Sequence, residues 1–227
     1  MRRTIAEVSS AQPAPDSTPG ALADSERALL CDLFLRVGPH APTLCAGWDT
    51  HHLAAHLVFR DGDTVRLVHV ALSGSSEAAV EELVHSTDFT ELVARVRTGP
   101  SPKSVFALPG VGRVTGTLEF FIHHEDVRRA GPRWTPRALS PAAQEDIWSP
   151  LRISARVLMR RSPVGVELAR SDAHGSARGA KGADAVVVRG LPSELALFAF
   201  GRGRVARVEI DGSERGIAAM RAAAFGI

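Results

Sequence analysis

The sequence of 227 residues contains no tyrosine, and aromatic residues make up only 5% of it. It also lacks a block of basic residues, so a stacking platform for nucleic acid is not expected. The only two cysteines, Cys31 and Cys45, do not make a disulfide framework. A reduced, cytoplasmic setting is therefore favoured. No apolar run approaches the roughly 20 residues of a membrane-spanning helix, so no membrane partner is expected.

What the chain does contain is enough apolar sequence for one large domain or two small ones. Hydrophobic residues account for 44% of it, and 27 basic residues nearly balance 25 acidic ones. Residues 1–21 are rich in Ser, Pro and Ala and lack the apolar core of a signal peptide. This composition predicts a disordered tail.

In the remaining chain, the pattern of apolar residues changes near Ser162, from helical periodicity to short valine-rich segments. Helical spacing of apolar residues predicts helices over 24–38, 49–72, 75–86, 88–99, 118–130 and 140–161. Pro150 is expected to kink or divide the last of these helices. Beyond it, the sequence predicts strands over 164–171, 184–190 and 204–212 and helices over 192–203 and 213–226. The expected fold class is α+β, with a helical bundle over 22–161 and a small α+β domain over 162–227.

One predicted helix, in the stretch LEFFIHHEDVRRAGP, has Glu119, His123 and Asp126 in the middle of its apolar face. Buried charges are costly unless they are paired or bind a metal. Glu119 and His123 stand four residues apart, so both side chains cover one patch of the helix. With a histidine from another helix they would form a three-ligand zinc site with an open fourth position. A buried hydrogen-bonded Glu–His pair without metal is the alternative.

The third ligand has three candidates, because His51, His52 and His56 lie on one predicted helix. The helical pattern does not choose among them, although His56 lies deeper in an apolar stretch than the other two.

Other motifs are not supported by the sequence. Arg128 occupies the position where a HExxH zinc-protease motif needs its second histidine. GRGR from Gly201 follows a helix instead of opening one, so it is no phosphate loop. Cys31 is expected in the core, and Cys45 is expected to be structural rather than a reactive thiol.

Three segments together resemble a known family. LCAGWDTHHLAAHLVFRD resembles the C-x-GW-[ST]-x-x-x-L-x-x-HL signature of mycothiol-dependent maleylpyruvate isomerase-like proteins, which belong to the DinB-like metal-binding superfamily. LEFFIHHEDVRRA resembles that family's second metal segment, and PSELALFAFGR resembles the P-x-E-L-x-x-x-x-x-GR element of its C-terminal domain. The resemblance covers nearly everything after Ser25 and extends to an actinobacterial subgroup of metal-binding proteins.

This resemblance implies a fold and a set of site residues. The fold would be a DinB-like four-helix bundle followed by a small domain similar to sterol carrier proteins. His56, Glu119 and His123 would bind zinc or another divalent metal. Asp126 would orient a ligating histidine or face the substrate. Arg202, in the GR element, would anchor an anionic substrate or a low-molecular-weight thiol such as mycothiol.

The function implied is that of a metal- and thiol-dependent enzyme, an isomerase or S-transferase acting on a small electrophile. An open zinc position can hold a thiol as thiolate, so the cofactor would supply the nucleophile that the chain lacks. The alternative is a non-catalytic metal-binding or small-ligand-carrying protein. A purely structural helical bundle is a third reading. We expect a small-molecule substrate and a low-molecular-weight thiol as partners, and a monomer or homodimer.

Overall fold

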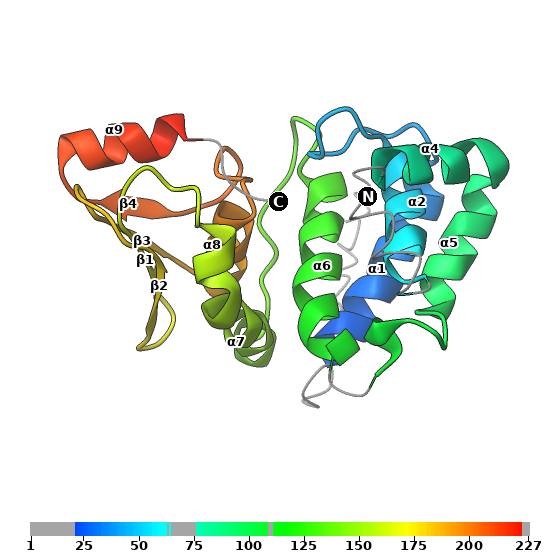
Figure 1. Ribbon diagram of the computed structural model, residues 1–227, viewed down its shortest axis with the longest axis horizontal. Helices are drawn as coiled ribbons and strands as arrows, with labels where there is room; N and C mark the ends of the chain where they lie inside the picture. Colours follow the sequence, from blue (N-terminus) through cyan, green and yellow to red (C-terminus); the bar gives the residue numbers. More distant parts are fainter. Residues whose placement is uncertain (1–20, 63, 65–75, 109–110, 224–227) are drawn as a thin grey trace, which may run out of the picture.

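The computed structural model describes residues 21–62, 64, 76–108 and 111–223. Helices and a four-stranded sheet form two adjoining groups in it (Figure 1). The first group contains α1 (Ala21–Val37), α2 (Thr50–Arg60), α4 (Ser76–Ser86), α5 (Phe89–Thr98), the short 3₁₀ helix η1 (Val105–Ala107) and α6 (Val111–Arg128). The second contains α7 (Pro141–Leu158), α8 (Pro192–Ala199), α9 (Glu214–Ala222) and the sheet. This mixture of helices and sheet agrees with the expected α+β class.

The sheet has the strand order β2-β1-β3-β4. Its strands are β1 (Val166–Arg170), β2 (Ser176–Ala180), β3 (Val186–Gly190) and β4 (Glu209–Asp211). The central pair, β1 and β3, is parallel, and both edge pairs are antiparallel. Strand β2 was not expected, because its sequence SARGA lacks the β-branched residues typical of strands. Its Gly179 allows α7 to approach, since a Cβ there would lie 2.9 Å from Met159 Sδ.

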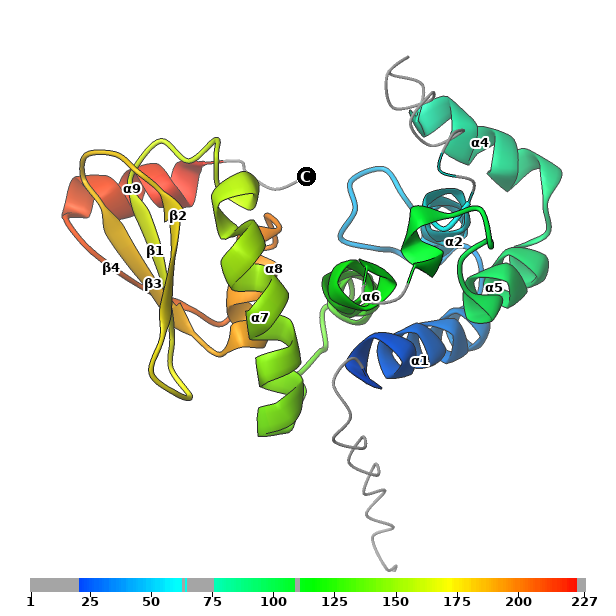
Figure 2. The same cartoon turned by 60° about the horizontal axis from the view of Figure 1, so that its bottom comes forward.

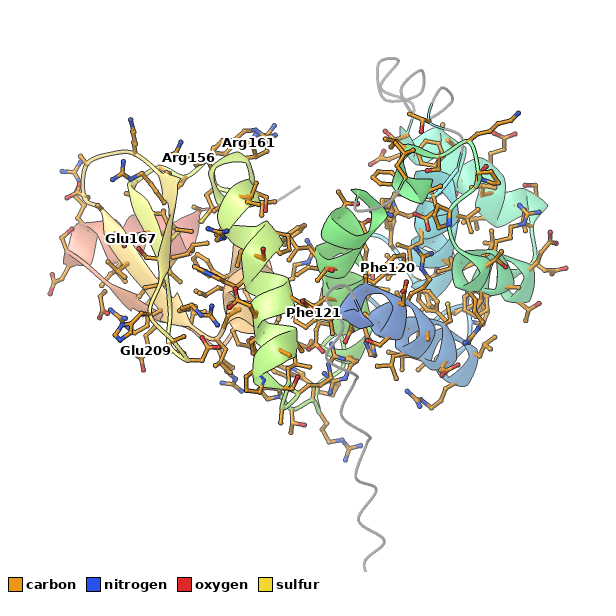
Figure 3. The ribbon with its side chains drawn as sticks, turned by 90° about the horizontal axis from the view of Figure 1, so that it is seen from below. Phe120, Phe121, Arg156, Arg161, Glu167 and Glu209 are labelled. Atoms are coloured by element: carbon orange, nitrogen blue, oxygen red, sulfur yellow. The ribbon has the colours of Figure 1, made fainter. Side chains whose placement is uncertain are left out.

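Helix α6 lies between the two groups and contributes to both hydrophobic cores (Figure 2). Phe120 belongs to the core formed with α1, α2 and α5, whereas the neighbouring Phe121 belongs to the core shared with α7, α8 and the sheet. Figure 3 labels both phenylalanines at this central helix. A helix enclosed in this way has no fully solvated face, so its polar residues need partners inside the protein.

Helix α7 packs against the sheet and α8, although the sequence placed it with the helical bundle. It begins as expected, with Pro141 in the first turn and the Ser140 hydroxyl accepting from Ala143 N–H at 3.2 Å. It runs without a break through Pro150, so of the expected kink or division the division does not occur. A proline removes one helical hydrogen bond, and here its ring is buried while the helix continues for eight residues.

The other expected elements lie near their predicted positions, with ends displaced by a few residues. In the described part of the chain, the second predicted helix ends at Arg60, and most of its predicted continuation to residue 72 lies outside the described residues. The predicted tail also lies outside them, except Ala21, which starts α1. The predicted strand 204–212 is shorter, because only Glu209–Asp211 pairs with β3. No described helix is long and apolar enough to cross a membrane.

Candidate metal centre

The candidate centre is formed by facing residues of α2 and α6. Asp49 caps α2, and its carboxylate accepts hydrogen bonds from the backbone N–H groups of His51 and His52 at 3.0 and 3.1 Å. This cap fixes the start of the helix. His56 follows in the second turn, where its ring lies 5.2 Å from that of Trp48. The capped helix thus carries His56 toward α6.

The structure brings His56, Glu119 and His123 together. Glu119 Oε1 lies 3.2 Å from His56 Nε2 and 3.3 Å from His123 Nε2. The nitrogen and oxygen atoms available as ligands all lie within 4.8 Å of one another. All three side chains keep part of their surface exposed, so they border a space and are not sealed in the core. Two imidazole nitrogens and one carboxylate form a donor set suited to zinc.

Electrostatics at this cluster favours positive charge between the two helices. Burial by itself would raise the pKa of Glu119, but hydrogen bonds with His123 and His56 outweigh it and hold that pKa well below its usual range. Burial would lower the pKa of His123, whereas its bonds with Asp126, Cys45 and Glu119 raise that pKa well above its usual value. Either protons or a divalent cation can supply this positive charge.

The other two histidines of α2 have different partners. His52 Nδ1 lies 2.6 Å from Asp49 Oδ1, and its Nε2 lies 3.3 Å from Glu81 Oε1 of α4. His51 Nε2 lies 3.2 Å from the backbone oxygen of Thr87. Among the three candidates named from the sequence, only His56 therefore meets Glu119.

Asp126 lies behind the cluster, on the far nitrogen of one of its histidines. Its Oδ2 is 2.9 Å from His123 Nδ1, and the side chain is fully buried. Burial would raise the pKa of Asp126, but hydrogen bonds with His123 and Arg202 lower it to about 2. This contact is the kind that fixes the orientation of a metal-binding histidine.

Arg202 reaches this carboxylate from the other group of elements. Its Nε and Nη2 donate to Asp126 Oδ1 and Oδ2 at 2.8 and 2.7 Å. Nη1 donates to the backbone oxygen of Phe200 at 2.6 Å. The guanidinium is therefore mostly engaged in joining the segment after α8 to α6.

Cys45 belongs to the same cluster, which sequence reasoning missed. Its Sγ lies 3.2 Å from Asp126 Oδ2, 3.4 Å from Arg202 Nη2 and 3.9 Å from His123 Nδ1. Cys45, His123 and Asp126 thus form a second group that could hold a metal. The available signal was the position of the cysteine in LCAGW, three residues before Trp48. Cys31, by contrast, is fully buried as expected, and burial raises its pKa to about 11.

The His56–Glu119–His123 group opens on a cavity of about 1520 Å³ between the two groups of elements. Trp48, His56, Glu119 and His123 line one side of it. Arg202 and the mainly apolar residues Phe198, Phe200, Val205, Ala206, Val208, Ile210 and Met220 line another. A small molecule in this cavity could therefore meet the cluster and an apolar wall together.

Fold and site together define an α+β protein with a His–Glu–His cluster beside a large cavity. Two solved structures of mycothiol-dependent maleylpyruvate isomerase, one of them a histidine-to-alanine mutant, share this fold. The mutant is 17% identical, with a TM-score of 0.58 over 86% of this chain and 91% of its own. The other is 16% identical, with a TM-score of 0.58 over 88% and 96% of the two chains. No protein-family model and no curated protein sequence matches the chain.

Proposed function

We propose that the chain is a zinc- or other divalent-metal-dependent enzyme that uses a low-molecular-weight thiol such as mycothiol. The observation that carries the proposal is the convergence of His56, Glu119 and His123 at the wall of the cavity. The fold shared with mycothiol-dependent maleylpyruvate isomerase supports it. The reaction would be an isomerisation or an S-transfer on a small electrophile.

The His56–Glu119–His123 group suits a metal better than the group that contains Cys45. Asp126 of the second group already receives two hydrogen bonds from Arg202, which neutralises its charge. A metal beside Asp126 would also meet this guanidinium at hydrogen-bond range, and like charges repel. At the first group, Arg60 Nε lies farther from the carboxylate, 3.6 Å from Glu119 Oε1. The first group has a carboxylate and two imidazoles facing the cavity, where an exogenous ligand can reach them.

The surrounding residues have separate roles in this proposal. A zinc ion held by the three side chains would lower the pKa of a thiol bound at its remaining position, so that the thiol reacts as thiolate. Asp126 holds His123 through Nδ1, which directs Nε2 toward Glu119. Trp48 packs beside His56 and limits how its ring can turn.

A thiolate supplied in this way accounts for both proposed reactions. When bound beside His56, Glu119 and His123, the thiol would supply a nucleophile for an activated double bond, reversibly in an isomerisation and permanently in an S-transfer. Arg202 lines the cavity and has one Nη1 hydrogen beyond the four hydrogen bonds described above. We propose that this hydrogen contacts an anionic group of the thiol or substrate.

A second candidate function is that of a metal-binding carrier of small apolar ligands. The apolar wall of the cavity, with Phe198, Val208 and Met220, favours it.

The division of the chain into a helical bundle over 22–161 and a small α+β domain over 162–227 also remains a proposal. The packing of α7 against the sheet favours a boundary before Pro141 over one after Arg161.

Turnover assays separate the enzyme from the carrier. Metal-loaded protein should convert a small electrophile with an activated cis double bond only when mycothiol is also present. Glu119→Ala should lower the rate at least about 100-fold, because it removes a ligand from the metal. His52→Ala should retain the rate, because His52 faces Asp49 and Glu81. Binding of the electrophile without any thiol-dependent conversion would favour the carrier.

A further inference from the structure

The cavity wall that carries Arg202 is a turn-rich segment of residues 201–208, here called the wall segment. It links the end of α8 to β4, and most of its residues line the cavity. Its backbone-to-backbone hydrogen bonds are local: Arg202 N–H donates to the Leu197 oxygen, and Val205 and Ala206 N–H donate to the Arg202 oxygen. These bonds shape the turn but do not attach it to the helices that carry the candidate metal ligands.

Two contacts make that attachment: the Arg202 side chain binds Asp126 of α6, and a buried ion pair binds the backbone of the wall segment. Arg129, the residue after α6, donates from Nη1 and Nη2 to the two oxygens of Glu194 at 2.9 and 2.7 Å. Arg129 Nη1 also donates to the backbone oxygen of Val205 at 2.8 Å. Glu194 Oε2 accepts from the backbone N–H of Arg207 at 2.8 Å. Both partners of the pair therefore bind the backbone of the wall segment directly.

The surroundings of the pair reinforce this attachment. The side chains of Arg129 and Glu194 are only 1% and 5% exposed, so water does not compete strongly for these bonds. The Trp134 ring contacts two guanidinium groups, with its centroid 4.5 Å from Cζ of Arg129 and 5.2 Å from Cζ of Arg207. Desolvated charges are expensive to bury, and apolar residues of similar size often give equal stability. A role beyond stability explains why charge is placed here.

The position of the pair indicates that role. Arg129 follows Asp126 by three residues, so the two side chains extend from neighbouring turns. Asp126 binds the guanidinium of Arg202, whereas Arg129 and Glu194 bind the backbone at Val205 and Arg207. We propose that Arg129 and Glu194 are positioning residues that fix the wall segment and thereby hold Arg202 beside Asp126 at the cavity. Their importance for thiol binding rests on the proposed function, but their control of the wall segment does not.

Two variants separate positioning from mere stability. Arg129→Met alone leaves Glu194 buried without its cation and should lower the melting temperature. The double variant Arg129→Met, Glu194→Leu removes both charges and keeps similar volume, so the melting temperature should recover most of that loss. Neither replacement can bond the Val205 oxygen or the Arg207 N–H. The double variant should therefore be stable and have a loosened wall segment.

Arg137→Met provides the matched control. Arg137 also forms a bidentate pair with a buried glutamate, Glu26, at 2.7 and 2.9 Å, and it donates to Glu125 as Arg129 does. It has no described bond to the wall segment. Arg137→Met should lower the melting temperature without loosening that segment.

Hydrogen exchange of the backbone amides is the measurement, with amides of β1 and β3 as reporters of global opening. In the double variant, exchange in the wall segment should accelerate about tenfold or more while the strand amides keep their rates. Arg137→Met should leave the ratio of wall to strand exchange unchanged. An unchanged ratio in the double variant, or an equal rise in Arg137→Met, would overturn the proposal.

A second readout connects the wall segment to the site. In cobalt-substituted protein, the double variant should keep its metal content but bind mycothiol about tenfold more weakly, because Arg202 keeps its bonds to Asp126 but its backbone is no longer fixed. Unchanged mycothiol affinity alongside faster exchange would overturn the link from the segment to Arg202. If the wild-type protein binds no thiol, the proposed function fails, and the exchange result still decides whether the pair fixes the wall.

Discussion

Zinc content should fall from about one ion per chain to near zero in both His56→Ala and His123→Ala, because each removes one of three protein ligands. The two ring nitrogens lie on different helices and approach the same oxygen of Glu119, at 3.2 and 3.3 Å. Each histidine therefore supplies a ligand position that the other does not fill. The measurement is metal analysis of protein purified without chelator. His52→Ala is the matched control from the same helix and should retain the ion.

The same experiment distinguishes the two groups of candidate ligands. His123 belongs to both of them, whereas His56 belongs to one and Cys45 to the other. If the metal lies at the cavity wall, Cys45→Ser should retain it. Loss of zinc in Cys45→Ser together with full zinc in His56→Ala would move the metal to the second group.

Asp126→Asn should lower the free energy of unfolding by about 3 kcal/mol, because it leaves the guanidinium of Arg202 without its carboxylate. The Asp126 side chain is fully buried and bonds both Arg202 and His123. Zinc affinity should also fall, by about 10- to 100-fold, because His123 loses the acceptor that orients its ring. Denaturant unfolding and competitive zinc titration measure the two effects.

Asp172→Asn provides the control for this loss. Asp172 also accepts two hydrogen bonds from one arginine, Arg170, at 2.9 and 3.0 Å, but it lies at the surface. Its substitution should cost less than about 1 kcal/mol, since Asp172 is partly exposed and Arg170 keeps its bond to Glu145. Equal losses of stability in the two variants would contradict the claim that burial makes the Asp126–Arg202 pair the more important one.

Acid titration of the folded protein tests the contribution of Asp126 to stability in a second way. The folded pKa of Asp126 is lowered to about 2 from an ordinary value of 3.8. A lowered carboxyl pKa stabilises the folded state above the unfolded pKa, and this contribution disappears as the pH falls from about 4 to about 2. It amounts to roughly 2 kcal/mol. In Asp126→Asn, that part of the acid dependence should be missing.

Local patterns were sufficient to predict most elements of the fold. Helical periodicity predicted α1, α4 and α5, and valine-rich runs predicted β1 and β3. Strand β2 was missed because it is made of small and polar residues, and its place depends on α7 packing over Gly179. Such a contact between distant segments leaves no local periodicity to detect.

The candidate site was predicted only in part, for a related reason. The spacing of Glu119 and His123 indicated a shared face of one helix, and the structure places them so. The helical wheel could not indicate that α6 is enclosed on both sides. Its other face, with His124 and Glu125, is consequently buried as well. The contacts of Cys45 and the hold of Arg129 on the wall segment arise only when the two groups of elements meet.

The most direct test of the central claim is the absorption spectrum of cobalt-substituted protein during titration with mycothiol. Our account places a metal at His56, Glu119 and His123 with a position open to the cavity. A thiol bound there as thiolate should produce a new sulfur-to-metal charge-transfer band, since water and carboxylate cannot act as such a donor. Glu119→Ala should abolish the band along with the metal. A wild-type spectrum unchanged by mycothiol and other biological thiols would contradict the account and leave the metal only a structural role between two helices.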